Sequence, residues 1–522
     1  MKLFFKLLGA ISFVSALLGL IVLGRDELIG LFDPDSRVAT VGDIRKIMQD
    51  EIDKELAPEN QAGLDSDRRA LRDKAVGQLI ERSPEAAQHI AGGRLAEGFD
   101  LLEKEAHAST ASAAREWREI GALAFDAQPQ RALEAYRMAT SLDDTDCWAW
   151  IFLARLEARQ AGRSAEAGRA AKEAFRVAKS DRERNKALNE ISRMQLRSGN
   201  LAAARTASEQ SVIVARAMVI ANPSTEAKRD LSISLERLAD VALKENDLVT
   251  AREVIDESLA IRRVLVAANL QSTEAQRDLS FALNKLGDLA VSVDDFGTAQ
   301  RAFQESLEIR RVLAIADPAS AIAKRDLSSS LERLGELAMK RNNMNVARNA
   351  FEENLEIRRA LAETNPNSAQ AKLDLTFALN NLGDVAMMAL DYKSARKAYQ
   401  EGLKIRSELA ASDPESVQAQ KDLLVSKQKI GLTELKSGNM DEAKVFLTEV
   451  VTGLKALVER DPARADHEVD LAVSYNWLGH ATGDVQHSAA ADAIEERLAS
   501  ANRLSPDGAK AIRDARNYVR PI

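Results

Sequence analysis

The dipeptide Asp-Leu recurs at a constant spacing in the second half of the chain, and this period restricts the fold more than any other feature. The aspartates lie 48 residues apart, at positions 230, 278, 326, 374, 422 and 470. The surrounding residues repeat as well, as in KRDLSISLERL and KRDLSSSLERL. A fixed period of about 20–50 residues is typical of an array of similar structural units. The length of 522 residues therefore counts repeats rather than separate globular domains.

Each repeat predicts two helices. A serine lies six residues before each of the first five aspartates, and its hydroxyl can accept a hydrogen bond from the first turn of a helix. These serines are Ser224, Ser272, Ser320, Ser368 and Ser416. Apolar residues such as Leu231, Leu235 and Leu238 follow at helical spacing. A second set of N-cap residues comes 17 residues after each Asp, at Asp247, Asp295, Asn343, Asp391 and Asn439. We expect two antiparallel helices of about 20 residues in each repeat.

A small residue in the first helix and an alanine in the second predict where the two helices cross. Glycine inside a helix costs up to about 1 kcal/mol relative to alanine, so its repetition needs a reason. The small residues are Ala239, Gly287, Gly335, Gly383, Gly431 and Gly479. Twelve residues after each of them stands an alanine, and in three repeats an aromatic residue follows four further on, at Phe303, Phe351 and Tyr399. We expect the aromatic ring to lie against the glycine.

This pattern resembles the tetratricopeptide repeat. Leu334-Gly335, Ala338, Ala347 and Phe351 match its consensus, although the usual unit has about 34 residues and this one has 48. The resemblance covers roughly residues 74–500 and implies an all-α solenoid of about ten antiparallel helical hairpins with a concave groove. Along the chain we expect a transmembrane anchor (1–25), a polar linker (26–73), irregular repeats (74–222), regular repeats (223–460) and a degenerate cap with a terminal helix (461–522).

Composition excludes several classes. Aromatic residues make up only 4% of the chain, which argues against a large β-sandwich or barrel. A single cysteine, Cys147, rules out an internal disulfide, and we expect a buried thiol there. The net charge of −8 gives no general attraction to nucleic acid, so no nucleic-acid partner is expected.

No motif for catalysis or cofactor binding stands out. The sequence has no phosphate loop, no dinucleotide fingerprint and no HExxH motif, so we expect neither enzymatic activity nor a cofactor. A metal site from His480, His487 and Asp484 is the weaker alternative to a solvated C-terminal cap. Pairs of arginines late in each second helix suit the negative end of the helix dipole, so structural pairing or solvation is the interpretation. These pairs are Arg262-Arg263, Arg310-Arg311 and Arg358-Arg359.

The first 25 residues form a separate segment. Lys2 and Lys6 precede an uncharged run that ends at Gly24, long enough for one helical crossing of a bilayer. A cleaved signal peptide is the alternative, but no good cleavage site follows. We expect a single-pass membrane protein with the repeats on the exported side. Residues 41–56 predict a short amphipathic helix, as part of a spacer or as a self-association element.

A polar ladder runs along the first helices of the repeats. One position precedes the small residue by three and the other follows it directly, so both lie on one helix face. The ladder consists of Glu236, Asp240, Asn284, Asp288, Glu332, Glu336, Asn380 and Asp384. In the family that the chain resembles, such positions line the concave groove. We expect this ladder to bind a peptide backbone or a basic segment, with a solvated repeat consensus as the alternative.

The predicted function is therefore a membrane-anchored scaffold or adaptor that presents a groove to a protein or peptide partner. Two alternatives stay open. The chain could self-associate as a structural component, or it could be a regulatory subunit of a membrane enzyme complex.

Overall fold

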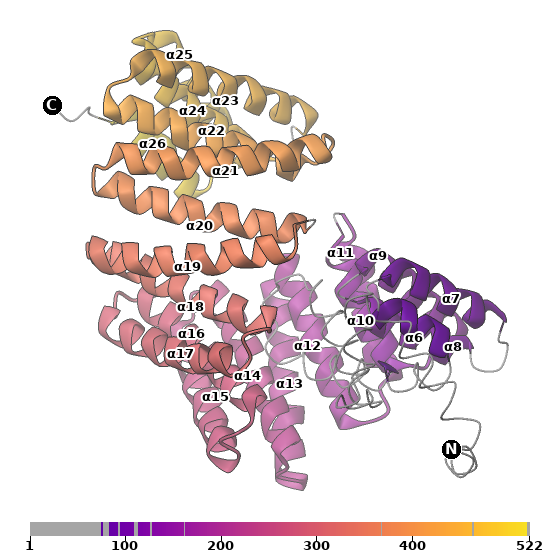
Figure 1. The fold of residues 1–522 in the computed structure, drawn as a ribbon. Coiled ribbons are helices and arrows are strands. Elements are labelled where there is room, and N and C mark those ends of the chain that lie inside the picture. Colours follow the sequence, from indigo (N-terminus) through magenta and orange to yellow (C-terminus); the bar gives the residue numbers. More distant parts are fainter. Residues whose placement is uncertain are drawn as a thin grey trace, which may run out of the picture. The chain divides into compact units, whose positions relative to one another are not determined.

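The computed structural model describes residues 75–76, 83–91, 94–108, 113–125, 128–160, 162–366, 368–461 and 464–518. The secondary structure assigned to these residues is helical, with turns between the helices (Figure 1). The chain divides into two compact units, Met1–Ser330 and Leu331–Ile522. The division falls inside the predicted run of regular repeats, 223–460, whose boundaries stay predictions.

The first unit begins with shorter helices and continues with longer ones. The helices are α6 (Pro84–Ala91), α7 (Leu95–Ala108), α8 (Ala113–Ala124), α9 (Pro129–Leu142), α10 (Cys147–Glu157), α11 (Ser164–Val177), α12 (Asp181–Arg197), α13 (Leu201–Ala221), α14 (Thr225–Lys244), α15 (Leu248–Ala268), α16 (Thr273–Ser292) and α17 (Phe296–Ala316). Helix α18 (Ala321–Lys340) carries the boundary between the units. Each helix from α8 to α16 packs against the next one along the chain.

The second unit continues the same alternation. Its helices are α19 (Met344–Thr364), α20 (Ala369–Met388), α21 (Tyr392–Ser412), α22 (Val417–Ser437), α23 (Met440–Arg460), α24 (Ala465–Thr482), α25 (Val485–Ser500) and α26 (Pro506–Arg516). Helix α26 confirms the expected terminal helix and packs mainly on α24. Both units thus confirm an all-α array of paired helices within the described residues.

The predicted helix starts are confirmed in the regular repeats. Ser224 accepts a hydrogen bond from the Ala227 amide at 3.1 Å, and the other four predicted serines make the same bond. Asp247, Asp295, Asn343 and Asp391 cap the second helices in the same way. Asn439 differs, because its side chain makes no cap bond and donates to Glu434 at 2.7 Å instead.

The residue before each second N-cap adopts a left-handed backbone conformation. Asn246, Asp294, Asn342, Leu390 and Gly438 have φ between 56° and 93°. This conformation reverses the chain between the paired helices. Asn, Asp and Gly tolerate it readily, whereas Leu390 is strained there and leaves its side chain 67% exposed.

The helix crossings confirm the expected contact between glycine and aromatic ring. A Cβ atom built on Gly335 would lie 2.5 Å from Cε1 of Phe351, and Gly287 and Gly383 are equally close to Phe303 and Tyr399. Real Cβ atoms do not approach other atoms so closely. Glycine is therefore required because the ring of the second helix fills the space of its side chain.

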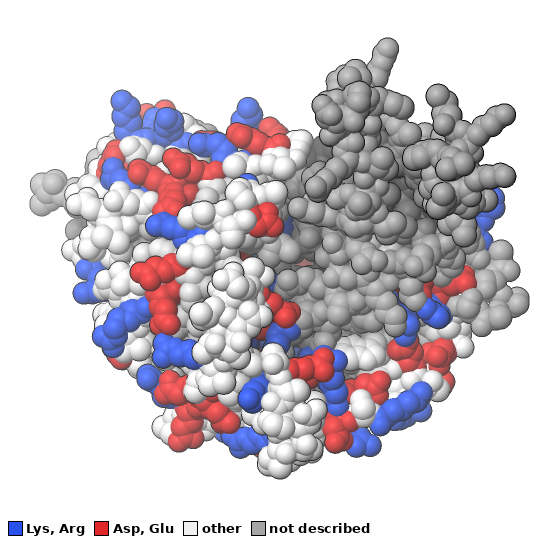
Figure 2. Space-filling view, turned by 60° about the horizontal axis from the view of Figure 1, so that its bottom comes forward, with Lys and Arg blue, Asp and Glu red and all other residues white. Residues whose placement is uncertain are grey.

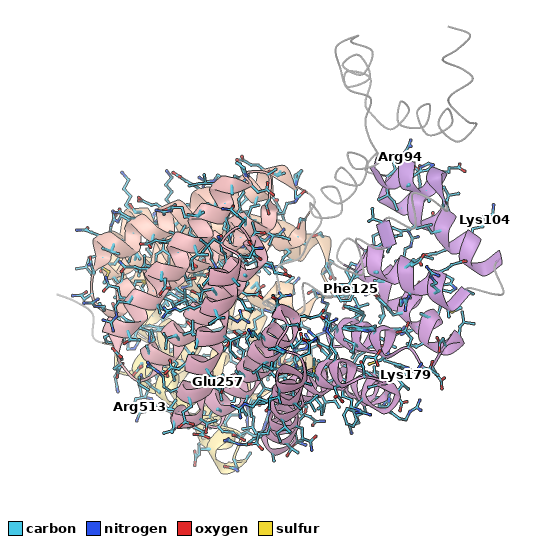
Figure 3. The ribbon with its side chains drawn as sticks, turned by 90° about the horizontal axis from the view of Figure 1, so that it is seen from below. Arg94, Lys104, Phe125, Lys179, Glu257 and Arg513 are labelled. Atoms are coloured by element: carbon cyan, nitrogen blue, oxygen red, sulfur yellow. The ribbon has the colours of Figure 1, made fainter. Side chains whose placement is uncertain are left out.

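The shorter repeats near the N-terminus use the same contact. A Cβ atom on Gly121 would lie 2.7 Å from the ring of Tyr136. Phe125, labelled in Figure 3, packs edge-on against Tyr136 and Phe152 at centroid distances of 6.3 and 5.6 Å. These rings form the centre of the apolar core of α8, α9 and α10.

The expected localisation as a single-pass membrane protein is wrong by the structure. Among the residues that the structure describes, no helix is long and apolar enough to cross a bilayer. The helices of 20 and 21 residues reach the required length of about 30 Å but carry charged side chains, as α15 does with Arg252, Asp256 and Glu257. The predicted anchor (1–25), the linker (26–73) and its helix at 41–56 lie outside the described residues.

Candidate partner-binding surface

The predicted polar ladder has two positions in each repeat. In the first unit, the residues three positions before the small residue are buried. Glu236 is only 6% exposed and pairs with Arg262 at 2.9 Å. Burial raises the pKa of Glu236, while Arg262 and Lys285 oppose that shift. Asn284 is also buried. These two side chains belong to the helix interface and do not form an open edge of a groove.

In the first unit, the ladder residues that directly follow the small residue are Asp240 and Asp288, and Asp240 is half-buried. Asp240 accepts hydrogen bonds from Arg237 at 3.1 Å and from Lys285 of the next repeat. Burial raises the pKa of Asp240, but Lys285 and Arg237 outweigh it and hold the pKa below 3.8. Asp288 is exposed.

The second unit repeats this arrangement. Asp384 accepts a hydrogen bond from the Tyr399 hydroxyl at 2.6 Å and pairs with Lys429 of the next repeat at 2.6 Å. Burial, followed by the charge of Asp384, raises the pKa of Tyr399. The remaining members are Glu332, which accepts from Asn381 at 3.2 Å, the exposed Glu336 and the buried Asn380. The binding role of the ladder stays a prediction, and its interior contacts favour a structural role for half of it.

The arginine that leads each basic pair is part of the helix interface. Arg310 is 1% exposed, donates to Ser280 at 2.9 Å and to the carbonyl oxygen of Asp326 at 2.7 Å. Arg406, in the same repeat position, donates to the carbonyl oxygen of Asp422 at 3.2 Å. The second arginine of the pair is exposed, as in Arg263, which pairs with Glu305 at 3.0 Å. The interpretation of these pairs as structural is confirmed for these arginines.

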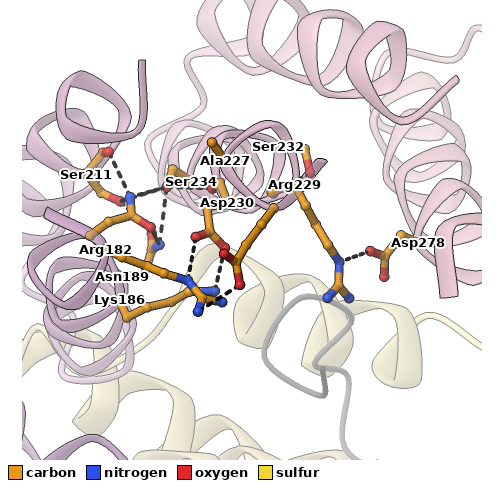
Figure 4. Close-up of polar contacts among 12 residues, drawn as sticks. Arg182, Lys186, Asn189, Ser211, Ala227, Arg229, Asp230, Ser232, Ser234 and Asp278 are labelled. Carbon is orange, nitrogen blue, oxygen red and sulfur yellow. Dashed lines mark hydrogen bonds and ion pairs between the residues drawn. The ribbon is translucent and has the colours of Figure 1, made fainter. Parts of the chain in front are cut away.

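The aspartate of the Asp-Leu motif connects successive repeats through its side chain. Asp230 is 2% exposed and forms ion pairs with Arg182 at 3.1 Å and with the buried Lys186 at 2.7 Å, both on α12 (Figure 4). Arg229 then reaches Asp278 of the following repeat at 2.5 Å. The motif therefore recurs because each of these aspartates binds the preceding repeat.

Charged residues of both signs mix on the surface. On the face drawn in Figure 2, basic and acidic side chains are interspersed, and neither sign forms a continuous patch there. Asp240, Asp384 and Arg263 each form an ion pair with a residue of the next repeat. Such a surface offers little net charge for a partner to recognise, so shape and apolar contact must carry more of the specificity.

An apolar row on the first helices of the second unit provides such a contact. Phe377 on α20, Val425 on α22 and Val473 on α24 lie three residues after the motif aspartate, 48 residues apart. Phe377 is 46% exposed, and the two valines are half-buried. We call these three residues the apolar row. Lys421, on α22, lies four residues before Val425 and forms ion pairs with Asp466 and Asp470, each at 2.9 Å.

Phe377 is exposed because one covering side chain is missing. In the first unit, the equivalent Phe281 lies beneath two guanidinium groups, those of Arg277 at 5.1 Å and Arg310 at 4.6 Å. Arg406 covers Phe377 at 5.4 Å, but the position of Arg277 is taken by Leu373 in this repeat. The ring therefore keeps one cation–π contact and one open face.

Sequence reasoning missed the apolar row although a signal was present. Phe281 and Phe377 both stand three residues after the motif aspartate, in a chain with few aromatic residues. The spacing of the rings alone could not separate them, because their cover depends on the residue four positions before each ring on the same helix, Arg277 or Leu373, and on an arginine of the following helix.

The remaining candidate groups are accounted for by packing. Cys147 is buried, and burial raises the pKa of its thiol to about 12. His480 contacts the carbonyl oxygen of Ala515 at 2.9 Å, and His487 stacks on Tyr475. Within the part of the chain that the structure describes, no three His, Cys, Asp or Glu side chains gather to hold a metal ion.

Comparisons with known proteins give structural likeness only. No protein-family model and no curated protein matches the chain. A signal-transduction ATPase with a tetratricopeptide repeat sensor from Pyrococcus horikoshii is 12% identical and covers 92% of this chain and 71% of its own, with a TM-score of 0.49. A tetratricopeptide repeat protein from Parabacteroides merdae is 13% identical, with coverages of 64% and 99% and a TM-score of 0.33. Human IFIT1 with PPP-AAAA is 13% identical, with coverages of 88% and 94% and a TM-score of 0.41.

Two of these three structures are tetratricopeptide repeat proteins by name, as the sequence resemblance implies. Their TM-scores all lie below 0.5, so the functional argument rests on the residues of this chain.

Proposed function

We propose that this protein is a protein-binding scaffold and that the apolar row of its second unit is a partner-binding site. The observation that carries the proposal is the exposure of Phe377 in a row that recurs with the repeat. The row places an apolar side chain at the same position of three successive first helices, and aromatic residues such as Phe377 dominate the energy of protein contacts.

Surrounding charges fit this role. Asp384 and Lys429 form an ion pair across repeats, and Lys421 pairs with Asp466 and Asp470, so these charged groups on the helices of the row are already paired. An apolar centre with a polar rim is the usual layout of a protein interface. Preorganised rim charges add little affinity but restrict the orientation of a partner.

Binding rather than catalysis remains the proposal for the chain as a whole. Of the charged residues that the sequence offered as candidates, Glu236, Asp240, Asp384 and Arg310 take part in contacts between helices. The row would suit a helical or extended partner segment with apolar residues, because successive first helices present similar side chains at regular intervals.

The test is affinity purification of the full chain and two variants. Phe377→Ala removes the exposed ring, and Gln400→Ala changes an exposed residue on α21 as a matched control. We expect the partner to remain with the wild type and with Gln400→Ala and to fall at least about tenfold with Phe377→Ala, with unchanged helical circular dichroism. Equal recovery in all three would refute the site. Light scattering of the same samples distinguishes a second copy of the chain from another protein.

A further inference from the structure

In the first unit, three alternate helices carry a basic residue at the same position, but the first of these helices has no acidic residue three positions later. Arg193, Arg237 and Lys285 occupy the same position in α12, α14 and α16. The acid three residues further on is Asp240 in α14, but the corresponding residue in α12 is Leu196. Arg193 therefore lacks the acid that its successors have.

The cations at this end share one buried carboxylate. Glu190 is fully buried and accepts a hydrogen bond on each carboxylate oxygen, from Arg155 of α10 at 2.9 Å and from Arg193 at 2.6 Å. Arg237 acts on the same carboxylate electrostatically, while its own hydrogen bond goes to Asp240. Lys285 also pairs with Asp240 and acts on Glu236, which already pairs with Arg262, so five cations face three carboxylates. The cluster carries an excess positive charge.

Two guanidinium nitrogens in the cluster are unsatisfied. The Nε atoms of Arg193 and Arg237 are buried and have no hydrogen-bond acceptor. Burial lowers the pKa of Arg193 to about 10. The attraction of Glu190 opposes this shift, and the repulsion of Arg155 and Arg237 adds to it. Buried polar groups are nearly always paired, and an excess of buried charge is unfavourable without a counterion.

The cluster is still within reach of a ligand. The side chains of Arg193 and Arg237 are 11% and 17% exposed, so part of each guanidinium reaches the surface. Contacts between α10 and α12 and between α12 and α14 hold the three arginines on neighbouring helices. The position of the donors is therefore fixed before any ligand arrives.

We propose that Arg155, Arg193 and Arg237 form a binding site for an oxyanion, either a phosphate or a carboxylate group. Guanidinium groups donate in a planar fork that matches both kinds of oxygen pair. The ligand would accept hydrogen bonds from the exposed parts of Arg193 and Arg237 and would reduce the excess charge of the cluster. The site lies in the first unit and is independent of the apolar row, so the failure of one proposal leaves the other standing.

Isothermal titration calorimetry of the full chain at constant ionic strength tests the site with two probes. One is inorganic phosphate, and the other is an acetylated tetra-aspartate peptide, which carries the carboxylates of an acidic partner. Arg193→Gln removes the charge, and Arg169→Gln changes an arginine of α11 that is 69% exposed and serves as the matched control.

We expect at least one probe to bind the wild type and the control alike, and Arg193→Gln to weaken it at least about tenfold. Tighter binding of phosphate would identify a free anion, and tighter binding of the peptide would identify a partner-borne carboxylate. Absence of binding for both probes, or full affinity in Arg193→Gln, would overturn the proposal. If Arg193→Gln loses its helical circular dichroism, Arg237→Gln replaces it under the same criteria.

Discussion

The contact between Gly335 and Phe351 gives the sharpest prediction about stability. A Cβ atom at residue 335 would lie 2.5, 2.6 and 2.8 Å from three atoms of the Phe351 ring, about 1 Å closer than ordinary contact. The ring is fully buried, and protein interiors are close-packed. Overpacking of this kind costs about 1–3 kcal/mol.

The sign of the Gly335→Ala effect separates this contact from simple helix propensity. Alanine gains up to about 1 kcal/mol over glycine within a helix, so a glycine without a tight neighbour should be improved by the change. We expect Gly335→Ala to destabilise its hairpin by about 1 kcal/mol net. Gly402→Ala is the matched control, because a Cβ atom there would have no neighbour closer than 3.9 Å. We expect that control to be neutral or stabilising.

A second substitution should repair the first. The first regular repeat has Ala239 and Ile255 where this repeat has Gly335 and Phe351. Phe351→Ile alone should cost about 1–2 kcal/mol through lost packing. Combined with Gly335→Ala, it should show a favourable coupling of at least about 1 kcal/mol, because the new methyl group occupies the vacated space.

Hydrogen exchange measured by mass spectrometry reads these changes locally. Peptides from α18 and α19 should exchange about five- to tenfold faster in Gly335→Ala and recover in the double variant, while peptides from α14 and α15 serve as an internal reference. Slower exchange in Gly335→Ala, or additive effects in the double variant, would refute the proposed crossing.

Three further predictions follow from other contacts. Asp230→Ala removes the carboxylate that pairs with the buried Lys186 and should cost about 3–5 kcal/mol in urea unfolding, whereas Asp256→Ala, which breaks an exposed pair with Arg252, should cost at most about 1 kcal/mol; equal effects would contradict the burial argument. Leu390→Asn should stabilise by about 0.5–1 kcal/mol, because asparagine tolerates the left-handed turn, and an unchanged or lower melting temperature would count against the strain. Hydrogen bonds from Thr250 lower the pKa of the Asp247 carboxyl below its usual value. The stabilisation by this N-cap is therefore present above about pH 4 and is lost as the pH falls through the lowered pKa. Asp247→Asn should make the melting temperature depend less on pH between about pH 5 and pH 2.5, and profiles parallel to those of the wild type would exclude the cap.

The repeat pattern predicted the helices and their starts because these depend on neighbouring residues. The serine caps, the aspartate caps and the glycine–aromatic crossings all involve side chains in the same repeat, so their spacing alone locates them. Gly335 and Phe351 could be paired from the sequence for this reason. Asn439 occupies its predicted N-cap position, but its side chain makes no cap bond and donates to Glu434 of the preceding helix instead.

The surface could be predicted less well because it depends on contacts between repeats. Glu236 and Asp240 share one helix face, yet Arg262 buries the first and Lys285 neutralises the second. A residue pattern within one helix cannot show which neighbouring side chain arrives there. The exposure of Phe377 is different, because it follows from Leu373, which lies four residues earlier on the same helix at the position of Arg277, so the sequence did carry that signal.

Site-specific photo-cross-linking tests the central claim of a partner-binding surface most directly. A photoreactive phenylalanine analogue replaces Phe377 in one sample of the full chain and Gln400 in another, and mass spectrometry identifies the products. The account predicts one reproducible protein partner cross-linked from position 377, through an apolar segment, and little from position 400. Equal products from both positions, or none from position 377, would contradict it.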